Sequence, residues 1–167
     1  MKKFLSKKKQ VLTLSFLVFS FMCIHLYSTV KVQVPTDPVT LTWASRHMTY
    51  SDISLNGKDN LLAVTPGEEV KISFNWNLKV DSGKIYCPGC IVQFYFGIKD
   101  TFSNCFFSGM TSPGSVKSGK ESKTFKAPLA PGIYYITQAI SLEYSCKPSP
   151  GRHSNNFKNA LAVIVVL

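Results

Sequence analysis

The chain lacks the sequence signatures of common enzyme classes. None of the G-x-S-x-G, H-E-x-x-H, phosphate-loop or dinucleotide-binding patterns occurs in its 167 residues. The nine carboxylates are scattered and form no recognisable acid–base pair. Of the three histidines, His25 lies in an apolar run, whereas His47 and His153 have polar, loop-like neighbours. We therefore expect a protein that is not an enzyme and that carries neither a metal nor a cofactor.

Helical periodicity is also missing beyond residue 30. Apolar and polar residues alternate instead, most clearly between residues 68 and 79. The apolar members of this segment are Val70, Ile72, Phe74, Trp76 and Leu78. This period of two predicts a half-buried antiparallel strand. Residues 91–98 are apolar on both faces, which is typical of a strand at the centre of a sheet.

Further short strands are predicted between Gly- and Pro-rich turns. They cover residues 39–43, 61–64, 104–108, 123–127, 133–140 and 160–167. Residues 141–146 can continue the strand at 133–140 after a bend. Residues 44–60 show no clear pattern. Seven or eight short strands without helices predict an all-β fold, an antiparallel β-sandwich. Residues 108–122 and 147–156, rich in Ser, Gly, Pro and Asn, are predicted surface loops.

The N-terminus predicts export across a membrane. Five of the first nine residues are lysine, and residues 11–30 form an uncharged, largely apolar run. A helix of roughly 17–25 apolar residues spans a bilayer, and flanking lysines keep their side in the cytoplasm. We expect a cytoplasmic basic flank at 1–10, a single-pass signal anchor at 11–30 and an exported domain at 31–167. A cleaved signal peptide, giving a secreted protein, is the alternative, although no small-x-small cleavage pattern ends the run.

The exported part has a modest positive charge. Residues 31–167 contain 14 Lys and Arg against 9 Asp and Glu, so about half of the whole-chain charge of +10 lies there. The basic residues are scattered except for Lys117, Lys120, Lys123 and Lys126, which alternate with Ser, Gly and Thr as an exposed polar face would. A basic stripe interleaved with aromatic residues is absent, so no nucleic-acid partner is expected.

Four cysteines, Cys87, Cys90, Cys105 and Cys146, follow the apolar run. An even number in an exported domain predicts structural disulfides. Pro88-Gly89 suits the centre of a type II turn, which brings the flanking Cα atoms within about 7 Å and permits a Cys87–Cys90 bridge. Cys105 would then pair with Cys146. A bridge between Cys90 and Cys146 is the competing pairing.

Three segments resemble immunoglobulin-like or fibronectin type III-like sandwich domains. They are TPGEEVKISFNW at 65–76, IVQFYFGI at 91–98 and APLAPGIYYI at 127–136. The resemblance is architectural and covers residues 39–167. It implies a tyrosine corner before a late strand, with Tyr134 or Tyr135 bonding back to the backbone. The Cys-Trp-Cys spacing of antibody domains is absent.

Export, strands and cysteines together predict a membrane-tethered or secreted binding or adhesion module. We expect its protein or surface ligand to bind through loops 108–122 and 147–156, because sandwiches display loops at their two ends. One alternative is a thiol–disulfide redox protein that uses the Cys87-Pro88-Gly89-Cys90 motif, although a strand-forming run follows this motif where reactive cysteines often precede a helix. A structural component of the cell envelope, without a discrete ligand, is another.

Overall fold

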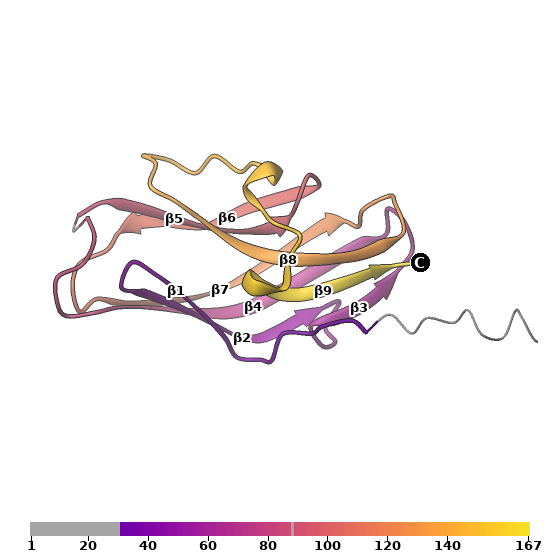
Figure 1. Cartoon of the computed structure of the whole chain (residues 1–167), viewed down its shortest axis with the longest axis horizontal. Helices are drawn as coiled ribbons and strands as arrows, with labels where there is room; N and C mark the ends of the chain where they lie inside the picture. Colours follow the sequence, from indigo (N-terminus) through magenta and orange to yellow (C-terminus); the bar gives the residue numbers. More distant parts are fainter. Residues whose placement is uncertain (1–30, 88) are drawn as a thin grey trace, which may run out of the picture. The chain divides into compact units, whose positions relative to one another are not determined.

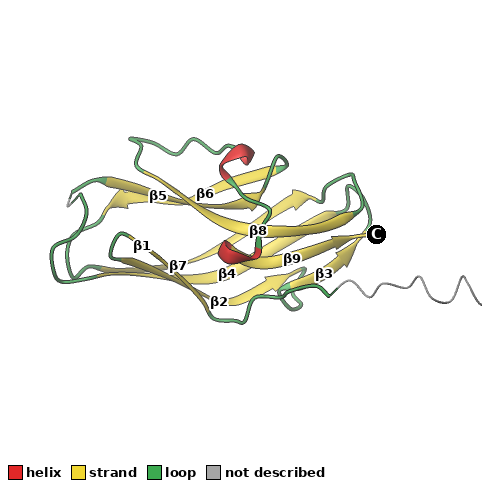
Figure 2. Ribbon diagram, viewed as in Figure 1, coloured by secondary structure: helices red, strands yellow, loops and turns green. Residues whose placement is uncertain are grey.

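Two stacked β-sheets make up the described part of the chain, which is residues 31–87 and 89–167 of a computed structural model. The strands are β1 (Val39–Trp43), β2 (Arg46–Leu55), β3 (Leu61–Val64), β4 (Glu69–Val80), β5 (Ile91–Ile98), β6 (Phe102–Met110), β7 (Val116–Lys126), β8 (Gly132–Ser141) and β9 (Ala160–Val166). One sheet has the order β1-β2-β4-β7 and the other has the order β3-β9-β8-β5-β6. Figure 1 and Figure 2 show the two layers. The prediction of an all-β sandwich is confirmed.

The predicted flank at 1–10 and membrane segment at 11–30 lie outside the described residues. In the part of the chain that the structure does describe, no helix has the length and apolar character needed to cross a bilayer. The only helices of that part are two short 3-10 helices, η2 (Pro150–Arg152) and η3 (Phe157–Asn159).

Three details of the predicted fold are wrong. The described residues form nine strands rather than seven or eight, and β3 runs parallel to β9, so the sandwich is not wholly antiparallel. The predicted loop 108–122 is largely strand, because β6 and β7 leave only residues 111–115 between them. In β7, the side chain of Phe125 alone is buried, so this edge strand lacks the alternation that identifies a half-buried strand.

All of β2 comes from residues 44–60, the segment that shows no clear pattern in the sequence. Met48, Tyr50, Ile53 and Leu55 of β2 are buried, but the first and last pairs are separated by a bulge between Ser51 and Ser54. A bulge inserts an extra residue and shifts the period-two pattern. The buried residues therefore fall on even positions before the bulge and on odd positions after it, so β2 as a whole shows no regular alternation in the sequence.

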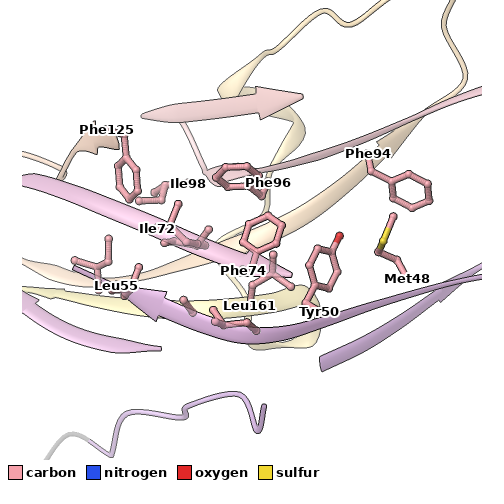
Figure 3. Close-up of a cluster of buried hydrophobic side chains, with 14 of the residues drawn as sticks. Met48, Tyr50, Leu55, Ile72, Phe74, Phe94, Phe96, Ile98, Phe125 and Leu161 are labelled. Carbon is pink, nitrogen blue, oxygen red and sulfur yellow. The ribbon is translucent and has the colours of Figure 1, made fainter. Parts of the chain in front are cut away.

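The core lies between the sheets and is rich in aromatic rings (Figure 3). Phe74 of β4 contacts Tyr50 and Phe96 edge to face, with centroids 5.4 and 5.2 Å apart. Phe102 stacks on Phe125 at 4.6 Å and joins the edges of the two sheets. Such pairs add about 0.5–1.5 kcal/mol each beyond the burial of their area.

The tyrosine corner forms at Tyr134, whose hydroxyl donates a 2.9 Å hydrogen bond to the carbonyl of Ala130. This bond fixes the entry of the chain into β8. Of the two candidates, Tyr134 and Tyr135, the structure selects the first.

Strand β5 is buried on both faces, as predicted for a central strand, and it pairs with both β6 and β8. Its outer face is covered by residues 142–159, the connection from β8 to β9, which crosses this sheet in Figure 1. The Cys105–Cys146 disulfide fastens the connection to β6, with a Cα–Cα distance of 5.8 Å. Closing a loop with this separation of 41 residues stabilises the fold by about 4 kcal/mol in the chain-entropy account.

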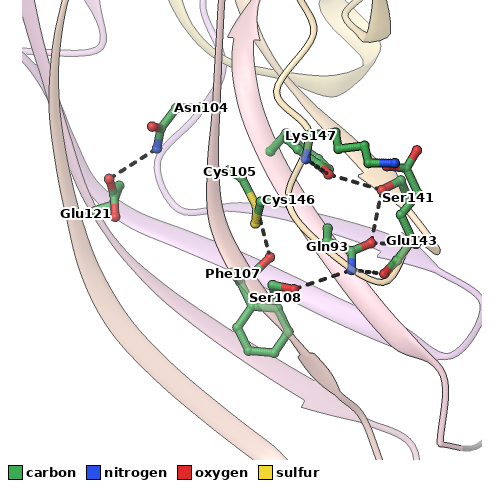
Figure 4. The surroundings of a disulfide bond; sticks show 11 residues. Gln93, Asn104, Cys105, Phe107, Ser108, Glu121, Ser141, Glu143, Cys146 and Lys147 are labelled. Atoms are coloured by element: carbon green, nitrogen blue, oxygen red, sulfur yellow. Dashed lines mark hydrogen bonds between the residues drawn. A yellow bond between two sulfur atoms is a disulfide. The ribbon is translucent and has the colours of Figure 1, made fainter.

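Polar side chains complete the contact between β5 and its cover (Figure 4). The fully buried Gln93 accepts hydrogen bonds from Ser141 Oγ at 3.1 Å and from the backbone N–H of Glu143 at 2.7 Å, and it donates to the Glu143 carbonyl. The Tyr95 hydroxyl accepts from the N–H of Lys147 at 3.3 Å. These bonds satisfy polar groups that burial would otherwise leave unpaired.

His153 belongs to the β8–β9 connection that covers β5, and its side chain is buried, with only 3% of the residue exposed. Its Nδ1–H donates to the Thr137 carbonyl at 3.0 Å, and its Nε2 accepts from the Ser103 hydroxyl at 2.9 Å. The imidazole lies over Gly97, where a Cβ would stand 2.6 Å from Nε2 and 2.1 Å from the Phe102 carbonyl oxygen. Only glycine leaves room for the ring.

Burial lowers the pKa of His153 to about 4, and the neighbouring Arg152 adds to the effect. Between pH 6.5 and this pKa, the unfolded chain binds a proton at this histidine that the folded chain excludes. The free energy of unfolding should therefore decrease as the pH falls, by about 2 kcal/mol from pH 6.5 to pH 5. Urea unfolding across this range measures the slope, and the His153→Gln variant should be less sensitive to pH. Equal slopes in the two proteins would show that His153 is not the titrating group.

Candidate binding surface at one end of the sandwich

Three loops meet at one end of the sandwich. They are the β1–β2 turn, the β4–β5 loop at 81–90 and the β6–β7 loop at 111–115, all on the left in Figure 1. Backbone hydrogen bonds join them, since the N–H of Asp81 donates to Ser45 at 3.0 Å and the N–H of Gly114 donates to Asp81 at 2.9 Å. We call this group of loops, together with the adjoining strand residues Met110 and Val116 and with residues 142–147, the loop end.

Arg46, the first residue of β2, holds the three loops together from inside. Its side chain is fully buried. The guanidinium donates to the Ala44 carbonyl at 3.0 Å, to the Cys87 carbonyl at 3.2 Å and to the Thr111 hydroxyl at 2.8 Å, so each loop supplies one acceptor. It also lies 5.4 Å from the centroid of the Trp43 ring.

No carboxylate of the described residues pairs with Arg46; the ion pairs found there are His47–Asp81 and Arg152–Glu143. Burial accordingly lowers the pKa of the Arg46 guanidinium. A buried charge is costly unless it is hydrogen-bonded, and here neutral acceptors from three loops do this alone. The Arg46 guanidinium thus holds the three loops in one arrangement, because each loop supplies one of its hydrogen-bond acceptors.

Sequence reasoning missed Arg46, although a signal was present. Arg46 is in phase with the buried residues Met48 and Tyr50, two and four positions later on the same strand. Period two places all three on the inner face. In the sequence, Arg46 falls within residues 44–60, for which no strand is predicted.

Exposed apolar side chains gather on the loop end. Of the ten large hydrophobic residues that are exposed in the described chain, five are here. They are Tyr86, Met110, Val116, Leu142 and Tyr144. Tyr144 is 95% exposed and Tyr86 is 65% exposed, and the Tyr86 ring contacts Trp43 edge to face at 6.3 Å. Tyrosine and methionine are enriched in protein-binding surfaces.

A shallow hollow of about 370 Å³ is lined by three of these side chains, Met110, Leu142 and Tyr144, together with Cys90. The Cys87–Cys90 disulfide stands beside it, with a Cα–Cα distance of 5.5 Å. A larger hollow of about 1030 Å³ lies at the opposite end of the sandwich, around Phe102, Phe125 and Leu129. That hollow has one strongly exposed apolar side chain, Leu129, whereas the loop end presents five.

The structure confirms the preferred cysteine pairing, Cys87 with Cys90 and Cys105 with Cys146, over the competing Cys90–Cys146 bridge. The predicted loop 147–156 does not stand alone at a tip, because it belongs to the connection that covers β5. His47 lies on the outer face, bonded to Thr42 Oγ1 at 2.9 Å and to Asp81 Oδ1 at 3.0 Å. Residues 31–87 and 89–167 contain no group of three His, Cys, Asp or Glu side chains arranged to hold a metal ion.

Comparisons with protein-family models, with curated proteins and with solved structures found no match for this chain.

Replacing Arg46 tests whether it organises the loop end. In the Arg46→Met variant we expect amide hydrogen exchange about tenfold faster in residues 84–90 and 111–115, because both loops lose their shared donor. Mass spectrometry of the exchanged peptides measures this. The Arg152→Met variant is the matched control and should leave these two loops protected. Unchanged exchange in the Arg46→Met loops would show that they are held by other contacts.

Proposed function

We propose that this chain is an exported binding module, tethered to a membrane or secreted, whose loop end docks a partner protein. Two disulfides in a β-sandwich support the exported state, because such bridges persist in oxidising compartments. The basic, apolar N-terminus of residues 1–30 supports the tether. The two-sheet arrangement with its tyrosine corner is in keeping with an immunoglobulin-like module.

The observation that carries the proposal is the group of five exposed apolar side chains at the loop end, of which Tyr86 and Met110 adjoin Cys87 and Thr111, the residues that Arg46 and the Cys87–Cys90 disulfide hold in place. Aromatic and Met side chains in the centre of an interface supply much of its binding energy. Loops already fixed in one conformation lose little entropy when a partner docks. A rigid apolar tip is therefore suited to recognition.

The position of the loop end agrees with a tethered module. The described chain enters at the opposite end, on the right in Figure 1, near the C-terminus. Pro35 accepts a hydrogen bond from Asn60 there at 2.7 Å, and Leu167 donates to Val64 at 3.0 Å. The loop end and the start of the described chain thus lie at opposite ends of the sandwich.

The thiol–disulfide alternative has less support. Cys90 leads directly into strand β5, whereas the reactive cysteine of a Cys-x-x-Cys motif usually stands at a helix N-terminus. No observation specifically favours a structural envelope component, so that alternative stays a prediction.

Site-specific photo-crosslinking in the cells that make the protein tests the docking proposal. A benzophenone amino acid is placed at Tyr144 and, as the matched control, at Leu129, which is exposed at the other end. We expect a discrete protein adduct from position 144 only, and its yield should decrease at least about fivefold with Tyr86→Ser and Met110→Ser together. The same adducts from both positions, or none from 144, would contradict docking at the loop end.

A further inference from the structure

We propose that the outer face of the β1-β2-β4-β7 sheet is a second binding site, which takes a linear acidic polysaccharide. The site is the part of this face formed by β4 and β7, together with the neighbouring residues of β2. We call it the lysine face. Its outward lysines are Lys71, Lys79, Lys120 and Lys126, all of them exposed.

Most of the net positive charge of the described domain is located on these two strands. Strands β4 and β7 contain six lysines and two glutamates, a net charge of +4, whereas residues 31–167 as a whole have a net charge of +5. The remainder of the domain is thus close to neutral. Charge concentrated in this way attracts an anionic partner and raises its association rate.

Two of the six lysines point toward the inner side of the edge strand β7. Lys117 and Lys123 are in register with Leu78 and Ile72, whose side chains point inward. Lys117 Nζ donates to the Met110 carbonyl at 3.1 Å and lies 5.4 Å from the Phe107 ring. Inward-pointing charges prevent strand pairing at an edge. The four outward lysines are not used in this way.

Between the outward lysines, the face consists of hydroxyl and amide side chains in rows across the strands. The rows are Thr49–Asn77–Ser118, Ser51–Asn75–Lys120 and Ser54–Ser73–Ser122. Neighbouring strands are about 4.8 Å apart, and alternate residues of one strand are about 6.7 Å apart. A flat array of donors and acceptors at these spacings can bond the hydroxyl and carboxylate groups of an extended sugar chain.

Two acidic residues share the face with the four outward lysines. Glu69 stands directly opposite Lys126 in the strand register, and Asp52 accepts a hydrogen bond from Asn75. Lysines therefore outnumber carboxylates on the face. The central lysine, Lys120, is paired across the sheet with Asn75 and has no carboxylate opposite it.

The same face lacks what other polyanions use. Binding of single-stranded nucleic acid relies on aromatic side chains that stack on bases, and the Trp76 ring instead packs over Gly119 on the inner side. Attachment to a bilayer requires apolar side chains, and among the outward residues of β4 and β7 only Val116, at the far end, is apolar. Lysines between hydroxyl and amide groups therefore favour an acidic polysaccharide.

Binding of polygalacturonate to the full chain in a non-ionic detergent tests the proposal. The Lys71→Gln/Lys120→Gln/Lys126→Gln variant should bind about tenfold more weakly than the unmodified chain at about 50 mM salt. The matched control is Lys58→Gln/Lys147→Gln/Lys158→Gln, which removes the same charge from exposed positions elsewhere and should change the affinity by less than about twofold. Circular dichroism verifies that both variants stay folded, and the N-terminal lysines are common to all three proteins.

Each other outcome overturns the assignment. Equal losses in the two variants would mean that net charge alone governs binding. If single-stranded DNA, polyglutamate or phosphatidylglycerol vesicles bind as tightly as polygalacturonate and depend on the same three lysines, the face is a general anion site. Neutral dextran should not bind. This test involves no residue of the loop end, so it is independent of the docking proposal.

Discussion

Burial of β5 on both faces is the constraint on which the second half of the chain depends. The sandwich core covers one face, and the connection between β8 and β9 has to cover the other. A segment of eighteen residues with two 3-10 helices has few apolar side chains for this purpose. The Cys105–Cys146 disulfide and the bonds of Gln93, Tyr95 and His153 hold it in place instead. The cover is thus fastened mainly by a covalent bond and by satisfied polar groups.

The loop end is also held together by a buried polar side chain, that of Arg46. Arg46 offers donors to three loops at once, and no carboxylate of the described residues neutralises it. The loops accept the hydrogen bonds of the buried guanidinium, and the same bonds fix the positions of the loops. Because Cys87 and Thr111 are fixed from inside, the neighbouring apolar side chains of Tyr86 and Met110 are left exposed on a fixed backbone. This separation of internal fastening from an exposed apolar surface favours a binding role.

How much of this could be predicted from the sequence depended on the local pattern. Strand β4 alternates without interruption and was identified almost to the residue, whereas the bulge in β2 and the solvent-facing edge strand β7 break or lack alternation. The two disulfides could be chosen because Pro88-Gly89 confines Cys87 and Cys90 to one turn. The candidate binding surface could not, because its residues come from segments around 86, 110 and 142–144 that only the packed sheets bring to one end of the sandwich.

The central claim is that an exported β-sandwich is fastened by two specific sulfur bridges. Peptide mapping under non-reducing conditions, on protein recovered from its own cells, tests this most directly. The account predicts one peptide containing a Cys87–Cys90 bridge and one peptide pair joined through Cys105 and Cys146, with no free thiol at these four positions. Four free thiols, or a peptide pair joined through Cys90 and Cys146, would contradict it.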